Sequence, residues 1–311
     1  MPEDELRAQA FAKALRALGA GATDEAAQIA SALARRRPDD PAARQLMAAV
    51  ALAKSDPVEA ERWALASLAV RPDHSATLIL AARAARARGD LPAAFERFAR
   101  ARELNPDRSE AAFGVAAILI QQNAPEAPRS VSDLQRLFPD HGPGWSEIGA
   151  QSEQAGKWEL AADAYARAAN SRPSAKLHLR LGSALQSLGR RSEAVASYRK
   201  ALELDPASAE TWFKLGLALQ DGRRPADAAL AYRRALSLRP ELAEAEANLG
   251  VALQELGDLA AAKEAYCRAI RLKPEAFGRI AQALTMAPTG ELWMDLAALR
   301  AHLSEPGRLS R

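Results

Sequence analysis

The stretch LGSALQSLGRRSEAVASYRKALELDP, from Leu181 to Pro206, reads as two short helices joined by a turn, yet Gly182 stands inside the first helix. A glycine in a helix interior costs about 1 kcal/mol relative to alanine. The chain accepts the same cost at Gly216, in LGLALQDGRRPADAALAYRRALSLRP, and at Gly250, in LGVALQELGDLAAAKEAYCRAIRLKP. The stretch is therefore one unit of an internal repeat, and the repeat decides the fold.

Prolines that end apolar-periodic helices set the period of this repeat. They recur at a nearly constant interval of about 34 residues, which is the length of a helix-pair repeat. These prolines are Pro38, Pro72, Pro106, Pro139, Pro173, Pro206, Pro240 and Pro274. An aromatic slot lies eight positions before them and holds Phe98, Tyr165, Tyr198, Tyr232 and Tyr266. Trp145 and Trp212 share a slot near the start of their units.

This pattern closely resembles the tetratricopeptide repeat family, which combines Trp, Leu-Gly, Tyr, Ala, Phe and Pro within each repeat. The resemblance covers about residues 7–274 as eight units. It is strong from Trp145 onward and weaker toward the N-terminus, where Ala48 and Ala82 replace the glycine. The resemblance implies an all-α fold, a right-handed superhelical solenoid of antiparallel helix pairs.

The repeat predicts how the chain is organised. Residues 1–140 hold about four degenerate repeats, and residues 141–274 hold four well-matched ones. Residues 275–303 are expected to form a degenerate ninth repeat or capping helices, and residues 304–311 a disordered tail. Prolines and glycines gather in residues 122–144, where either a hinge or a tolerated irregularity is expected.

The glycines have two predicted roles. Gly182, Gly216 and Gly250 let the two helices of a pair approach closely, so we expect leucine at Gly182 to be harmful and alanine to be tolerated. Gly189 and Gly257 instead end the first helix of their units.

Composition excludes several classes of protein. The chain has 311 residues, 49% hydrophobic and 26% charged, as in a globular protein. A net charge of +3 with interleaved signs points to no polyanion partner. The single cysteine, Cys267, excludes a disulfide framework and a cysteine-based zinc site. No stretch is long and apolar enough to span a membrane, and the acidic N-terminus lacks the features of a secretory signal, so a cytoplasmic location is expected.

Residue patterns that would carry chemistry are missing. The four histidines (His74, His141, His178 and His302) are isolated, and His178 occupies the slot of Trp145 and Trp212, which indicates a packing role. The glycines are a repeat apart rather than clustered as in a phosphate-binding loop. We therefore expect no catalytic residues, no metal and no cofactor.

One arginine-rich face has two interpretations, a nucleic-acid patch or a solvated face with ion pairs. Its residues are Arg83, Arg86, Arg88, Arg97, Arg100 and Arg102. Asp90, Glu96 and Glu103 are interleaved with them and no aromatic platform accompanies them, which favours ion pairs.

The resemblance implies a concave groove lined by the first helix of each unit, along which repeat arrays bind partners. The groove-facing candidates are Ile79, Arg83, Arg86, Phe113, Ile120, Glu147, Lys176, Arg180, Phe213, Lys214 and Asn248. A carboxylate clamp of the kind that binds chaperone tails is rejected. Lys176 and Arg180 match that scheme, but Glu147, Phe113 and Ala117 stand where the clamp needs lysine and asparagine.

These observations favour a non-catalytic protein-interaction or scaffold protein that binds a protein or peptide segment along the groove. Apolar contacts are expected from Ile79 and Phe113, and charge contacts to an acidic segment from Arg83 and Arg86. An accessory region of a larger transferase, such as a sulfotransferase or glycosyltransferase, is the alternative, and a reading frame that continues past Arg311 would favour it. A nucleic-acid-binding solenoid is the third hypothesis, and salt-sensitive retention of RNA or DNA would favour it.

Overall fold

The computed structural model describes residues 3–276, 278 and 280, and these residues form helices without any strand. The α-helices are α1 (Glu3–Gly19), α2 (Thr23–Arg36), α3 (Pro41–Ala53), α4 (Pro57–Leu68), α5 (Ser75–Ala87), α6 (Leu91–Leu104), α7 (Ser109–Gln121), α8 (Ala127–Leu137), α9 (Gly142–Gln154), α10 (Trp158–Ser171), α11 (Ala175–Ser187), α12 (Arg191–Leu204), α13 (Ala209–Asp221), α14 (Pro225–Leu238), α15 (Ala243–Glu255) and α16 (Leu259–Leu272). A short 3-10 helix follows at Pro274–Ala276. Most of the predicted ninth repeat and all of the predicted tail lie outside the described residues.

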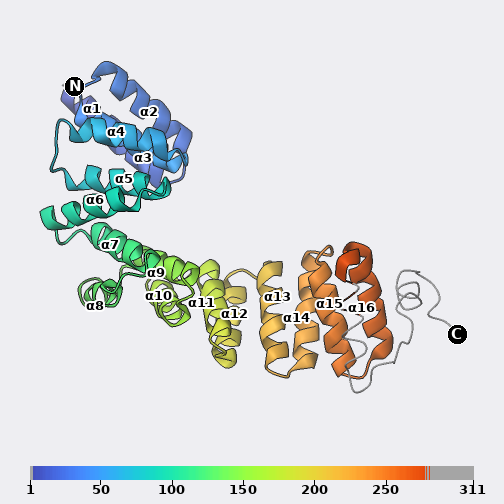
Figure 1. Ribbon diagram of the computed structural model, residues 1–311. Coiled ribbons are helices and arrows are strands. Elements are labelled where there is room, and N and C mark those ends of the chain that lie inside the picture. The colour runs from blue at the N-terminus through green and yellow to red at the C-terminus, as the bar shows by residue number, and fades with distance from the viewer. Residues whose placement is uncertain (1–2, 277, 279, 281–311) are drawn as a thin grey trace. The chain divides into compact units, whose positions relative to one another are not determined.

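The chain divides into two compact units, Met1–Ala155 with α1 to α9 and Gly156–Arg311 with α10 to α16. Within each unit, most helices pack as consecutive antiparallel pairs that stack on one another, although α9 packs on α7 (Figure 1). The all-α solenoid predicted from the repeat is therefore confirmed. The predicted hinge at 122–144 stays a prediction.

The second helix of each pair starts and stops at fixed places in the repeat. Helices α6, α12 and α14 all begin at the same distance from their repeat prolines and end two positions before them. Side chains often cap the helix starts: Asp90 accepts a hydrogen bond from the Ala93 N–H at 3.1 Å, and Ser208 one from the Thr211 N–H at 3.2 Å. Such caps satisfy backbone donors that have no partner inside the helix.

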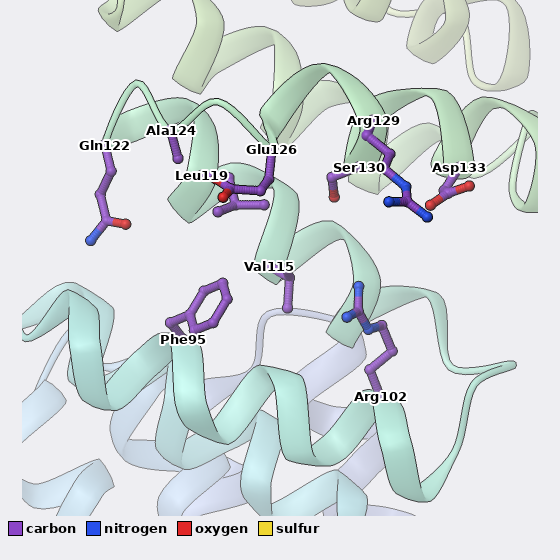
Figure 2. Close-up of a pocket in the computed structure, with 10 residues that line it drawn as sticks. All are labelled: Phe95, Arg102, Val115, Leu119, Gln122, Ala124, Glu126, Arg129, Ser130 and Asp133. Atoms are coloured by element: carbon purple, nitrogen blue, oxygen red, sulfur yellow. The ribbon is translucent and has the colours of Figure 1, made fainter.

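Helix α8 departs from this register. It begins at Ala127, nearly one turn later relative to its repeat proline than the other second helices, because Pro125 and Pro128 cannot stand inside a helix. Pro128 falls in its first turn, where a proline is tolerated. The connecting residues Gln122, Ala124 and Glu126 line a pocket instead of forming a helical turn (Figure 2).

Residues Gly142 to Gly144 look like a flexible spacer in the sequence, but they form the first turn of α9. Gly144 is buried under the ring of Phe113, and a Cβ built on it would lie 2.4 Å from that ring. The helix begins here because Pro143 suits a first turn and the His141 ring accepts a hydrogen bond from the Gly144 N–H at 3.1 Å.

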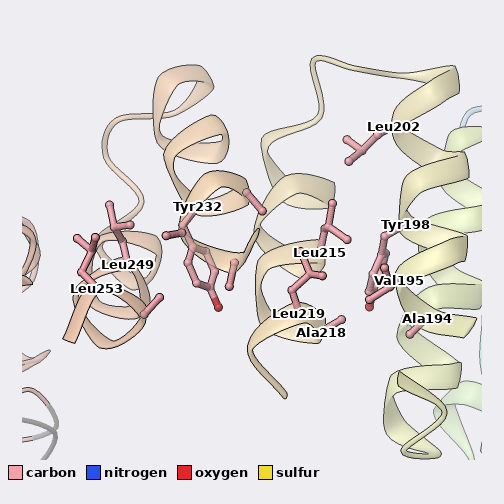
Figure 3. Close-up of a cluster of buried hydrophobic side chains, with 14 of the residues drawn as sticks. Ala194, Val195, Tyr198, Leu202, Leu215, Ala218, Leu219, Tyr232, Leu249 and Leu253 are labelled. Carbon is pink, nitrogen blue, oxygen red and sulfur yellow. The ribbon is translucent and has the colours of Figure 1, made fainter. Parts of the chain in front are cut away.

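The close-approach role of the interior glycines is confirmed. A Cβ on Gly182 would lie 2.6 Å from the ring of Tyr198, and Gly216 and Gly250 meet Tyr232 and Tyr266 in the same way. Tyr198 and Tyr232 also pack toward the following helix pair (Figure 3). This geometry opposes the expectation that alanine is tolerated at Gly182, because a methyl group would overlap the Tyr198 ring unless the ring moved.

The turn inside each pair needs one residue in the left-handed conformation. Glycine takes this slot at Gly189 and Gly257, as predicted, with φ of 71° and 83°. Ser55, Asn123 and Arg223 occupy the same slot with φ of 58°, 52° and 55°. For a residue with a Cβ this conformation costs roughly 1–2 kcal/mol, so the turn geometry is imposed by the repeat rather than by glycine alone.

Candidate functional site

The odd-numbered helices form the inner layer of each unit. In the second unit α11 contacts α13, and α13 contacts α15; in the first unit contacts run from α1 through α3, α5 and α7 to α9. Among the described residues, successive even-numbered helices are farther apart. The odd-numbered helices therefore form one layer of the stack, and those of the second unit keep a face with half-exposed residues.

In the second unit these free faces form one continuous surface. On α13, half-exposed Phe213, Leu217 and Gln220 stand at positions i, i+4 and i+7 and therefore share a face. The equivalent residues are Leu179, Ser183 and Gln186 on α11 and Ala247, Val251 and Gln254 on α15. These nine residues are called the inner stripe below.

The buried tyrosines hold one end of the inner stripe in place. Tyr198 donates its hydroxyl to Gln186 Oε1 at 2.9 Å, Tyr232 to Gln220 Oε1 at 2.8 Å, and Tyr266 to Gln254 Oε1 at 2.9 Å. Gln186 Nε2 in turn donates to Asp221 Oδ2 at 2.9 Å, which ties α11 to α13. The Gln186 and Gln220 amides therefore keep a fixed orientation at the surface, whereas Gln254 is buried.

Burial keeps these hydroxyls protonated. Burial, together with the nearby Asp221 and Glu210 carboxylates and against the lowering effect of the Ser183 hydrogen bond, raises the pKa of Tyr198 to about 12. Burial also raises the pKa of Tyr232 and of Tyr266. The tyrosines are structural hydrogen-bond donors at neutral pH.

Only part of this surface was predicted from the sequence. Of its candidates in the second unit, Phe213 belongs to the inner stripe, while Lys176, Arg180, Lys214 and Asn248 flank it as exposed or half-exposed residues. The sequence analysis missed the three glutamines. A signal was present, because the tripeptide Ala-Leu-Gln recurs in the first helix of each of the three repeats of the second unit. Binding by these residues stays a prediction.

Three candidates in the first unit are not available at the surface. Ile79 is 6% exposed, Phe113 1% and Ile120 0%. Helix α7 packs tightly on α9, where the Phe113 ring lies over Gly144 and meets the Trp145 ring edge-on with centroids 5.4 Å apart. The expectation that Ile79 and Phe113 make apolar contacts to a partner is therefore wrong in this structure.

The charged candidates of the first unit are also engaged. Arg86 of α5 forms an ion pair with Glu147 of α9. The arginine that was expected to attract an acidic partner segment therefore already has an acidic partner within the chain. Arg83 is exposed. The charges of Arg86 and Glu147 therefore neutralise each other.

The predicted ion pairing of the arginine-rich face is confirmed for four arginines. Besides Arg86, Arg97 contacts the buried Glu61 at 2.6 Å, Arg88 pairs with the same carboxylate, and Arg100 contacts Asp73 at 2.9 Å. Burial raises the pKa of Glu61, but hydrogen bonds from Arg97 and Arg88 outweigh this effect and hold the pKa below its usual value.

Metal-ligand geometry is not found in the part of the chain that the structure describes, where no three His, Cys, Asp or Glu side chains gather. His178 is half-buried, and burial with the nearby Lys200 lowers its pKa, as expected for a packing residue. None of the helices searched, all within the described residues, is long and apolar enough to cross a membrane.

Comparison with known proteins places the repeat in a family. Sequence models described as TPR repeat or tetratricopeptide repeat match residues 182–221, residues 209–242 and 243–275, and residues 79–139. The chain is a tetratricopeptide repeat protein. The matches in the second unit cover the pairs α13–α14 and α15–α16 and, from residue 182 onward, the pair α11–α12.

Comparisons with solved structures and with curated proteins give weaker similarity than the family models. A crystal structure of MamA superposes with a TM-score of 0.45 and 17% identity over 62% of this chain and 95% of that one. A structure described as YrrB, a TPR protein with an unusual peptide-binding site, gives a TM-score of 0.47 and 17% identity over 70% of this chain and 95% of that one. No curated protein matches the sequence significantly.

Proposed function

We propose that this tetratricopeptide repeat protein is a non-catalytic interaction scaffold and that the inner stripe of its second unit binds an extended peptide segment. The observation that supports the proposal is the half-exposed apolar surface on three successive inner helices. Leu179, Phe213, Leu217 and Val251 contact the core yet keep part of their surface in solvent. Contiguous apolar surface of this kind usually marks an interaction site.

The spacing of the inner helices favours an extended segment. Neighbouring packed helices lie about 8–10 Å apart, and a chain in the extended polyproline II conformation advances about 3.1 Å per residue with three residues per turn, so every third side chain shares one face. Every third residue of a bound segment therefore meets the next inner helix. We expect apolar residues at i, i+3 and i+6 of the partner, which would contact α11, α13 and α15 in order.

Charges at the two ends of the inner helices add direction. Lys176 stands near the start of α11 and Lys214 midway along α13, while Asp221 and Glu255 are the last residues of α13 and α15. Complementary charges mainly set specificity and the rate of association. The preferred segment carries an acidic residue on the lysine side of its apolar residues and a basic residue on the other side.

Selection of peptides from a random library tests the proposal. Peptides selected on the wild-type protein should share the apolar spacing, and Leu217→Glu should weaken their binding by at least about tenfold, or roughly 1.4 kcal/mol. Because Leu217 is partly packed against the core, the surface variant Lys214→Glu is measured in parallel, and circular dichroism checks that both variants fold.

Leu230→Glu is the matched control, because Leu230 lies on the outer helix α14 and is 63% exposed. It should bind the selected peptides as the wild type does. Equal loss in the control and in Leu217→Glu, or no loss in either inner variant, contradicts binding at the inner stripe.

A further inference from the structure

A recess lies between α6, α7 and α8 of the first unit, away from the inner stripe of the second unit (Figure 2). Its volume is about 580 Å³, within the range of about 300–1,000 Å³ that ligand pockets occupy. It exists because α8 lacks the first turn that the other second helices have, so the non-helical residues Gln122, Ala124 and Glu126 border it.

The floor of this recess, called the α6–α8 pocket below, is apolar. Phe95 comes from α6, and Val115 and Leu119 come from α7. Val115 is buried, while Phe95 and Leu119 keep part of their surface exposed. A partner's aliphatic or aromatic side chain that entered the pocket would cover these two residues and gain the free energy of apolar burial, about 25 cal/mol per Å².

Two arginines face each other across the pocket. Arg102 projects from α6 and Arg129 from α8, and both guanidinium groups point into the space between the helices (Figure 2). Within the residues that the structure describes, neither of them forms an ion pair, unlike Arg86, Arg97 and Arg100 nearby. Two converging unpaired cations repel each other, and an anion between them would remove that repulsion and accept hydrogen bonds from both.

The two acidic residues at the pocket already have other roles. Asp133 forms an ion pair with Arg136 on its own helix at 3.2 Å. Glu126 directly precedes α8, where a negative charge interacts favourably with the helix dipole. The four charges at the pocket balance formally, and Arg102 and Arg129 are the two that face each other across it (Figure 2).

We propose that the α6–α8 pocket binds an acidic peptide segment in which an Asp or Glu carboxylate adjoins a large apolar side chain. The apolar side chain contacts Phe95 and Leu119, and the carboxylate bridges Arg102 and Arg129. A peptide fits better than a fatty carboxylate because Gln122 and Ser130 present an amide and a hydroxyl at the pocket, which can bond to peptide groups but not to a hydrocarbon chain. This site is separate from the inner stripe and would let the scaffold hold two segments.

Fluorescence anisotropy with two labelled synthetic peptides tests the proposal on the full chain. One peptide has the sequence GDLFDG with blocked ends, and the other has lysine in place of both aspartates. The acidic peptide should bind the wild type at least about tenfold more tightly than the lysine peptide. The double variant Arg102→Glu with Arg129→Glu should lose at least about tenfold of that affinity.

Arg35→Glu with Arg71→Glu is the control, because it makes the same change in net charge at exposed positions of the same unit. It should bind within about twofold of the wild type, and Leu217→Glu in the inner stripe should also leave this affinity unchanged. Equal binding of the two peptides, or equal loss in the control, would overturn the proposal.

Two further results would also overturn it by assigning the pocket another occupant. One is full displacement of the acidic peptide by decanoate at equal concentration, which indicates a lipid-like carboxylate. The other is a dimer in sedimentation experiments that the Arg102→Glu, Arg129→Glu variant dissociates, which indicates a second copy of this chain.

Discussion

Replacing Gly182 with alanine tests the packing of the repeat most sharply, because two opposite effects compete at this position. Alanine improves helix propensity by about 1 kcal/mol. Its Cβ, however, would lie 2.6 Å from Tyr198 Cε1 and 2.7 Å from Cδ1, whereas carbon atoms prefer about 3.5–4.0 Å. The ring would have to move by about 1 Å.

Tyr198 has little room to move. It is 0% exposed, and its hydroxyl donates to Gln186 at 2.9 Å. Overpacking of a core typically costs about 1–3 kcal/mol, so the overlap outweighs the propensity gain. We expect Gly182→Ala to lower the free energy of unfolding by about 1–2 kcal/mol.

A double-mutant cycle in urea isolates the cause. In a Tyr198→Ala background the ring is gone, so Gly182→Ala should become neutral or stabilising by up to about 1 kcal/mol. Gly19→Ala is the control, because Gly19 ends α1 and a Cβ added there would have no atom within 4 Å. The reasoning is refuted if Gly182→Ala is as stable as wild type, or if its cost persists without the tyrosine ring.

Three further outcomes follow from single positions. The turn inside each helix pair needs a residue in the left-handed conformation, so Arg223→Gly should stabilise the chain by about 1 kcal/mol. Gly189→Ala, in the same slot, should destabilise it by a similar amount. Thermal melting of the two variants and the wild type measures both changes. Arg86→Glu should lower the melting temperature by placing like charges together, and adding Glu147→Arg should restore it; failure of that rescue contradicts the ion pair. The pKa of Tyr198, about 12 in the fold against about 10 in an unfolded chain, predicts full stability below pH 10 and a loss of stability as the pH rises from about 10 to 12. Tyrosinate absorbance that titrates near pH 10 in the folded protein would contradict that burial.

The sequence predicted those features that depend on the repeat period. The regularly spaced prolines, each with an aromatic residue eight positions earlier, fix where helices end and which face is buried. The contact between Gly182 and Tyr198 followed from these positions. The closeness of that contact could not be predicted from the sequence, because whether a methyl group fits beside the ring depends on distances of tenths of an ångström.

The first-unit candidates failed for a different physical reason. The repeat frame assigns Phe113 and Ile120 to a free face, but it assumes regular stacking of the helices. Pro125 and Pro128 delay α8, and α7 packs mainly on α9, which covers the side chains of α7 on that side. Pairing partners such as Arg86 and Glu147 were likewise hidden, because they lie on helices two repeats apart in the sequence.

Site-specific photo-crosslinking tests the central claim that the inner stripe of α11, α13 and α15 is the binding surface. The photoreactive residue p-benzoylphenylalanine replaces Leu217 in one protein and Leu230 in another, and each is irradiated with a labelled peptide selected on the wild type. We predict a crosslinked product from position 217, and an excess of unlabelled peptide should suppress it. We predict no crosslinked product from position 230. Crosslinking from position 230, or none from position 217 to a peptide that still binds, would contradict it.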